Sequence, residues 1–99
     1  MAKVLFRQKA IVDLNDIWEY TFQNWSEKQA DNYYEILKLV CKEIGHNPQL
    51  GKEYFYIWEN LFGLKAGKHI IFYHLISENE IEVIRILHER MDFKNRLTE

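Results

Sequence analysis

Arg85, His88 and Tyr73 are the residues of this 99-residue chain whose types best suit cleavage of RNA. Metal-independent cleavage needs a base for the 2′-hydroxyl, an acid for the leaving oxygen and cations around the developing charge. Histidine and tyrosine can move the protons, and arginine can supply the charge. Side chains of an extended strand alternate between two faces, however, so Arg85 and His88 are expected on opposite sides. The spacing does not predict a compact catalytic centre, and we expect no catalytic residue.

Arginines in the last part of the chain suit contact with another macromolecule. Arg85 lies among apolar residues, so we expect it to be buried and paired with a carboxylate such as Asp92 or with the C-terminal backbone. Arg90 and Arg96 fall in the tail, where an exposed cation can reach a partner. Arg85, Arg90 and Arg96 are therefore the candidates for binding a target, while structural hydrogen bonding is the favoured role of His88.

Metal and cofactor chemistry find no support in the residue pattern. Cys41 is the only cysteine, which excludes an intrachain disulfide and a multi-thiolate metal site and favours a reducing cytoplasm. His69 and His74 are expected on opposite faces of one strand, so they do not form a metal site. The chain has no phosphate-binding glycine loop and no nucleophile elbow. We therefore expect no cofactor and no metal.

Composition limits the class of protein. The formal net charge of -2 lacks the basic excess with which proteins bind nucleic-acid phosphates, so direct nucleic-acid binding is not expected. The longest apolar stretch, residues 70–76, is far shorter than the roughly 20 residues that cross a bilayer. No signal-peptide pattern is present at the N-terminus. With 99 residues, 47% of them hydrophobic, the sequence predicts one domain over residues 1–99, located in the cytoplasm and not bound to a membrane.

Two helices follow a short opening strand. Alternating apolar residues predict a strand over residues 3–8, and apolar residues at three- and four-residue steps predict a helix from Ala10. Ser26 to Gln29 matches a capping box, which predicts the start of a second helix, and Gly45 is expected to end that helix in a left-handed conformation. Because only a few residues join the helices, they must form an antiparallel hairpin. Its core is expected to include Trp18, Trp25, Tyr33 and Tyr34.

Three strands are predicted in the second half of the chain. Residues 61–66, 68–76 and 81–88 are rich in β-branched and aromatic residues and are separated by short polar links, which predicts an antiparallel meander. Residues 49–60 fit either a strand or a loop, and residues 89–97 fit one or two helical turns. The predicted fold is α+β with two layers: a strand, an antiparallel helical hairpin, a three-stranded antiparallel meander and a short C-terminal helix.

Both faces of the predicted sheet are apolar. Alternation places His69, Ile71 and Tyr73 on one face and Ile70, Phe72 and His74 on the other, while Ile84 and Ile86 oppose Val83 and Arg85 in the next strand. One helical hairpin covers only one face. Our hypothesis is that a partner protein covers the second face. The equally open alternative is that the C-terminal turns and residues 54–58 cover it. The candidates for partner binding are His69, Ile71, Tyr73 and Val83.

Four segments in this order resemble the ParE branch of the RelE/ParE toxin superfamily of bacterial type II toxin–antitoxin systems. They are AIVDLNDIWEY at residues 10–20, NPQLG at 47–51, IIFY at 70–73 and IRILHERMD at 84–92. Together they span nearly the whole chain. The resemblance implies the same strand, hairpin and meander that the periodicity predicts.

The resemblance also implies a function. ParE toxins are known to inhibit DNA gyrase and are neutralised by a ParD-like antitoxin, whereas RelE toxins cut mRNA on the ribosome. The near-neutral charge favours the gyrase inhibitor. Such a toxin acts by protein contact rather than as an enzyme, and it belongs to a plasmid-stabilisation system. In that case Arg85, Arg90 and Arg96 would bind gyrase, and His69, Ile71, Tyr73 and Val83 would bind the antitoxin. The alternative is a ribosome-dependent endoribonuclease that uses Arg85, His88 and Tyr73. A further possibility is a family member that only binds its antitoxin.

Overall fold

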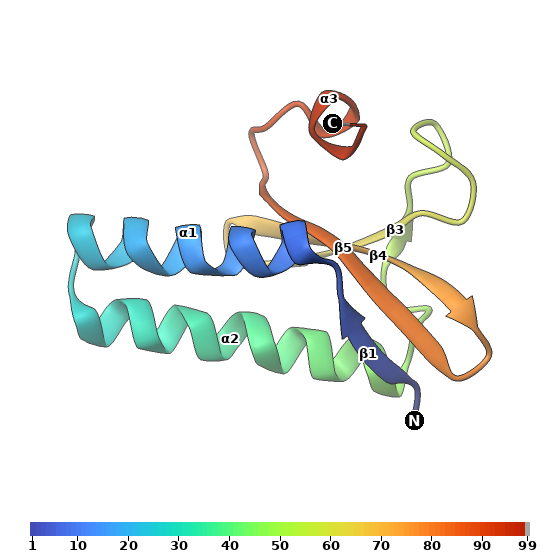
Figure 1. Cartoon of the computed structure of the whole chain (residues 1–99), viewed down its shortest axis with the longest axis horizontal. Coiled ribbons are helices and arrows are strands. Elements are labelled where there is room, and N and C mark those ends of the chain that lie inside the picture. The colour runs from blue at the N-terminus through green and yellow to red at the C-terminus, as the bar shows by residue number, and fades with distance from the viewer. Residues whose placement is uncertain (99) are drawn as a thin grey trace.

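The computed structural model describes residues 1–98, in which a hairpin of two long helices packs on a five-stranded sheet (Figure 1). The predicted α+β fold is confirmed, including the meander and the short C-terminal helix. The elements in chain order are β1 (Lys3–Phe6), α1 (Gln8–Asn24), α2 (Glu27–His46), β2 (Lys52–Glu53), β3 (Phe62–Ala66), β4 (His69–Ser77), β5 (Glu80–His88) and α3 (Phe93–Leu97).

The sheet joins the first strand of the chain to the last. The strand order is β1-β5-β4-β3-β2, and β1 pairs parallel with β5, with Val4 opposite Ile81 and Phe6 opposite Val83. The other neighbours are antiparallel. Because β1 ends at Phe6, the outer edge of β5 beyond Val83 has no strand beside it. Helix α1 begins at that point and runs past the open edge.

The helical hairpin begins as predicted but ends differently. The Ser26 hydroxyl accepts a hydrogen bond from the Gln29 backbone N–H at 3.1 Å, which starts α2. Helix α2 ends at His46, near Gly45 as predicted, but the expectation of a left-handed stop at Gly45 is wrong, because Gly45 stays in the helix and the cap residue Asn47 is extended. Gly45 instead allows close packing: a Cβ there would lie 2.9 Å from Val4 Cγ2, so a larger residue would push β1 away.

A β-bulge changes which residues of β5 face the hairpin. Phe72 pairs with Arg85 and Tyr73 pairs with Val83, so Ile84 is an extra residue without a partner. The expectation that Ile84 and Ile86 share a face is therefore wrong. Ile86 packs under the helices, whereas Ile84 packs on the opposite face. Buried residues under the hairpin include Leu14, Leu37, Cys41, Ile44, Ile71, Tyr73, Ile81, Val83 and Ile86.

The chain itself covers the opposite face of the sheet. Residues 49–60, for which strand and loop were both open, form the two-residue β2 and a loop, and the Tyr54 N–H donates to the Leu61 carbonyl at 2.7 Å. The predicted C-terminal turns form α3, whose first turn is capped by the Asp92 carboxylate. In Figure 1, α3 lies apart from α2, with the sheet strands between them. Loop and helix residues of this second core are Tyr54, Ile57, Trp58, Leu61, Phe93 and Leu97. The hypothesis that one face of the sheet needs a partner is therefore wrong. The loop and α3 cover the face with Ile70 and Phe72, while the face with Ile71 and Tyr73, which was expected to be open, lies under the hairpin.

A buried polar cluster closes the open edge of β5. The Asp13 carboxylate of α1 accepts from Arg85 Nε at 2.8 Å, from Arg85 Nη2 at 3.1 Å and from the Ile86 backbone N–H at 2.9 Å. Arg85 Nη1 donates to the Arg96 carbonyl in α3 at 2.9 Å. The two side chains are only 10% and 12% exposed. Asp13 thus replaces the missing strand partner and ties α1, β5 and α3 together.

Three other features of the described chain bear on function. None of the helices within residues 1–98 has the length and apolar character needed to cross a membrane. Over the same residues, no three His, Cys, Asp or Glu side chains come together as a metal site. Burial raises the pKa of Cys41 to about 12, so its thiol stays protonated and unreactive at neutral pH.

Candidate functional site: an apolar groove beside the hairpin

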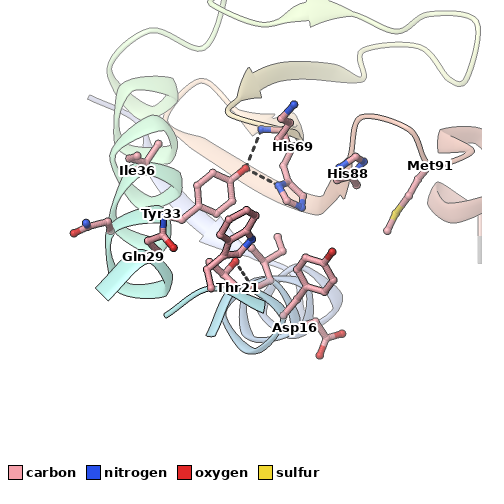
Figure 2. Close-up of a pocket in the computed structure, with 13 residues that line it drawn as sticks. Asp16, Thr21, Gln29, Tyr33, Ile36, His69, His88 and Met91 are labelled. Carbon is pink, nitrogen blue, oxygen red and sulfur yellow. Dashed lines mark hydrogen bonds between the residues drawn. The ribbon is translucent and has the colours of Figure 1, made fainter. Parts of the chain in front are cut away.

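A groove of about 890 Å³ runs between the helical hairpin and the end of the sheet (Figure 2). Its walls are the facing sides of α1 and α2, and its floor is formed where β4 begins and β5 ends. The residues that line it are Asp16, Ile17, Tyr20, Thr21 and Trp25 from α1 and its end, Gln29, Asn32, Tyr33 and Ile36 from α2, and Lys68, His69, His88 and Met91 from the sheet end. We call this surface the groove.

Large apolar side chains are unusually exposed in the groove. Trp25, at the turn between the helices, is 70% exposed, and Tyr20 is 66% exposed. Ile36 and Met91 also belong to the exposed apolar residues. The periodicity of α1 favoured Trp25 as a core residue, and that interpretation is wrong. Since exposed apolar clusters mark sites of recognition, the groove is the candidate functional site.

The inner end of the groove is polar and begins with Tyr33. Its hydroxyl accepts from the Lys68 backbone N–H at 3.0 Å and lies 2.6 Å from His69 Nδ1 (Figure 2). Burial raises the pKa of Tyr33 and lowers the pKa of His69 to about 4. At neutral pH the phenol is therefore protonated and the imidazole neutral, so that the Tyr33 O–H can donate to His69 Nδ1 at 2.6 Å or to the Ala66 carbonyl at 3.2 Å.

His88 lies beside His69 because the two residues are register partners. The antiparallel pairing of β4 and β5 places them opposite each other, and their rings meet edge to face with centroids 5.3 Å apart. His88 Nδ1 accepts from the Arg90 backbone N–H at 3.1 Å. Sequence reasoning missed this pair, and it missed Tyr33 and the groove. Counting equally in both directions from the turn between the strands would have paired the two histidines.

The residues considered for RNA cleavage are not brought together. Arg85 is held by Asp13, and the Tyr73 hydroxyl donates to the Pro48 carbonyl at 2.7 Å and accepts from the Gly51 N–H at 2.9 Å. Tyr73 pairs with Val83, five positions along β5 from His88, which corresponds to about 16 Å along a strand. The three side chains therefore form no common site.

The residues considered for antitoxin binding lie mostly under the hairpin. Ile71, Tyr73 and Val83 have no exposed surface and belong to the core that α1 and α2 cover. The expectation that this face is open is wrong, since it is the face that the helices occupy. Of the four candidates, only His69 reaches the groove.

The C-terminal arginines differ from one another in their surroundings. Arg85 is buried in the polar cluster with Asp13, whereas Arg90 and Arg96 are exposed. Within residues 1–98, neither the Arg90 nor the Arg96 guanidinium has a hydrogen bond or ion pair. Their side chains are therefore available to a partner molecule.

Comparison with known proteins relates this geometry to a family. Residues 4–93 match the family model described as the ParE toxin of the type II toxin–antitoxin system parDE. The chain is 32% identical to Toxin ParE1 of Mycobacterium tuberculosis over 96 residues, which cover 97% of this chain and 98% of that protein. It is 30% identical to Toxin ParE1 of Caulobacter vibrioides over 90 residues, 91% of this chain and 92% of that one.

Solved structures of chains from toxin–antitoxin systems show the same fold. A chain of the chromosomal ParDE system from P. aeruginosa matches with a TM-score of 0.76 at 16% identity, over 89% of this chain and 96% of that chain. A chain of the RelBE2 toxin–antitoxin complex from Mycobacterium tuberculosis matches with a TM-score of 0.64 at 16% identity, over 89% and 98%. Because the family match covers most of the chain, this protein belongs to the ParE toxin family of type II toxin–antitoxin systems.

Proposed function

We propose that this toxin inhibits DNA gyrase through protein contact and that a cognate ParD-like antitoxin neutralises it. The observation that carries the proposal is the family match over residues 4–93, because ParE toxins are the branch that acts on gyrase. Gyrase inhibition places the protein in the cytoplasm and lets the toxin–antitoxin pair stabilise a plasmid. The separation of Arg85, His88 and Tyr73 gives the ribonuclease alternative no comparable support.

In this proposal Arg90 and Arg96 make the gyrase contact. Both are exposed on the segment from the end of β5 through α3, and neither guanidinium is held by another side chain of the described residues. Arg85 acts as a positioning residue, because its bond to the Arg96 carbonyl fixes α3 against β5. The contact would form while gyrase holds cleaved DNA, so that the broken strands accumulate.

The antitoxin is proposed to occupy the groove. Its exposed aromatic and aliphatic residues offer the kind of surface that an amphipathic protein segment buries, and rings such as Trp25 and Tyr20 are common binding hot spots. The structural relatives include chains from toxin–antitoxin complexes, which supports an antitoxin as the partner. A groove that runs up to Met91 also brings the bound segment close to the C-terminal arginines.

A supercoiling assay tests the proposal. Purified toxin added to gyrase, relaxed plasmid and ATP should abolish supercoiling and accumulate linear cleaved DNA, and prior addition of the antitoxin should restore supercoiling. The double variant Arg90→Ala with Arg96→Ala should lose the effect. The matched control, Lys28→Ala with Lys42→Ala on the exposed surface of α2, removes the same charge and should retain it.

Normal supercoiling at toxin excess, with no cleaved DNA, contradicts the proposal. Site-specific cuts in a translated message under the same conditions would instead assign the ribonuclease activity. Retention of gyrase inhibition in the arginine double variant would contradict the assigned contact but not the target.

A further inference from the structure

The inner end of the groove presents hydrogen-bond donors that the protein does not use. The Tyr33 O–H can donate to His69 Nδ1, which lies 2.6 Å away, or to the Ala66 carbonyl, which lies 3.2 Å away. The shorter contact favours His69 Nδ1 as the acceptor, and the proton of the neutral imidazole is then on Nε2. Within residues 1–98, Nε2 of His69 has no hydrogen-bond partner. In Figure 2, the ring nitrogen of His69 that is not bonded to Tyr33 points away from Tyr33.

His88 has the same tautomer for an independent reason. Its Nδ1 accepts from the Arg90 backbone N–H, which places the imidazole proton on Nε2. Over the described residues this Nε2 also has no hydrogen-bond partner. Because the two rings stand edge to face with centroids 5.3 Å apart, the groove ends in two neighbouring N–H donors.

The charges around the two imidazoles favour an acidic group. Lys68 lines the same end of the groove and has no ion pair within residues 1–98. Of the nearby carboxylates, Glu89 is paired with Lys65 at 3.0 Å and Asp13 is bound to Arg85 at 2.8 Å. Asp16 lines the wall on α1, across the groove from the sheet. An incoming carboxylate would therefore meet donors and the ammonium group of Lys68, whose charge also acts on Glu89.

We propose that the imidazole N–H groups of His69 and His88 bind one carboxylate side chain of the antitoxin segment that occupies the groove. The proposal rests on the proposed function, which places that segment there. A carboxylate accepts two hydrogen bonds through its two oxygens, so it satisfies both donors at once. The aromatic walls of Tyr20 and Trp25 fit the apolar side chains of the same segment, with the acidic residue at the inner end.

The proposed contact makes the binding affinity depend on pH. His69 is faced by Tyr33 on α2, Asp13 on α1, and His88 and Glu89 at the end of β5. Burial lowers the pKa of the free His69 to about 4. A bound carboxylate favours the protonated imidazole and raises that pKa, so binding takes up a proton at mildly acidic pH. Affinity should therefore increase by about threefold as the pH falls from 8 to 5.

Nuclear magnetic resonance of the full chain with ¹⁵N-labelled histidine tests the site with a defined probe. We would titrate 3-phenylpropionate and, as a neutral control, 3-phenylpropanamide. The carboxylate should shift the Nε2 resonances of His69 and His88 and should bind more tightly at pH 5 than at pH 8. The amide should leave both resonances nearly unchanged. Unlabelled antitoxin should displace the carboxylate probe.

Two histidine variants distinguish a loss of the N–H donor from a general effect on the fold. His88→Phe keeps a ring but removes the N–H, and it should weaken binding of 3-phenylpropionate and of the antitoxin about tenfold. His74→Phe is the matched control, because His74 lies on β4, the strand paired with β5, but bonds to Glu82 outside the groove. Equal shifts with both probes, shifts confined to other histidines, or no displacement by the antitoxin would each overturn the proposal. A toxin that inhibits gyrase and binds its antitoxin but shows no response at His69 or His88 contradicts this inference alone.

Discussion

The buried polar cluster and the groove both contain hydrogen-bond donors, but the donors of the cluster are paired within the chain, whereas the groove keeps two imidazole donors without a partner in the described residues. In the cluster, the Asp13 carboxylate satisfies both Arg85 and the Ile86 N–H, and little of either side chain reaches solvent. In the groove, imidazole donors stay unpaired beside a 70% exposed Trp25. A fully satisfied buried network stabilises the fold, whereas accessible donors beside exposed apolar surface are suited to a partner. The buried polar cluster therefore stabilises the fold, and the groove is suited to recognition of a partner.

The largest expected effect comes from the matched aspartates of α1. Asp13→Ala leaves the Arg85 guanidinium and the Ile86 N–H unpaired in the interior, so the free energy of unfolding should fall by about 3–5 kcal/mol. Asp16→Ala, on the groove wall, should change it by less than about 0.5 kcal/mol. Urea unfolding measures both values. Equal losses in the two variants would remove the distinction between the regions.

Matched tyrosines provide a smaller test. Tyr73→Phe removes a buried hydroxyl that bonds to the Pro48 carbonyl and the Gly51 N–H, and it should lower the free energy of unfolding by about 1–2 kcal/mol. Tyr20→Phe, on the exposed groove wall, should have almost no effect. Thermal unfolding followed by circular dichroism would detect the difference. A Tyr73 variant as stable as the parent chain would show that this hydroxyl contributes nothing to the fold.

The two long helices and the meander could be predicted because their signals are local. Ser26 and Gln29 mark a helix start by themselves, and the strands are separated by short polar links. The parallel pairing of β1 with β5 joins the two ends of the chain, and no local pattern encodes it. Simple alternation predicts the wrong faces after the bulge at Ile84, because one extra residue moves each following side chain of β5 to the other face of the sheet.

The candidate site was harder to predict than the fold. Trp25 continues the apolar stripe of α1, so periodicity alone suggested burial, yet it lies past the last residue of the helix, where the sheet no longer covers it. Arg85 was correctly expected to be buried and bound to the C-terminal backbone, but its carboxylate partner is Asp13 rather than Asp92. Such contacts depend on how α1 crosses the open edge of β5. That arrangement cannot be predicted from the spacing of residues in the sequence.

A third expected effect is the pH dependence that His69 gives to stability. Burial lowers its pKa from 6.5 to about 4, so the unfolded chain binds more protons than the folded chain between those values. The contribution of His69 is thus complete above pH 6.5 and is lost as the pH falls toward 4. Urea unfolding at pH 7 and pH 5 should show a smaller difference in His69→Gln than in the parent chain. The exposed His46→Gln should retain the parent difference, and an unchanged slope in His69→Gln would contradict the assignment.

The most direct test of the groove as the recognition surface is calorimetric titration of the antitoxin into two equally exposed aromatic variants. Trp25 is 70% exposed inside the groove, and Phe55 is 73% exposed on the loop that covers the opposite face. Neither substitution by alanine should alter folding. Trp25→Ala should weaken antitoxin binding by at least about tenfold, while Phe55→Ala should bind like the parent chain. Parent-like affinity in Trp25→Ala, with a loss in Phe55→Ala, would place the antitoxin on the other side of the molecule and contradict this account.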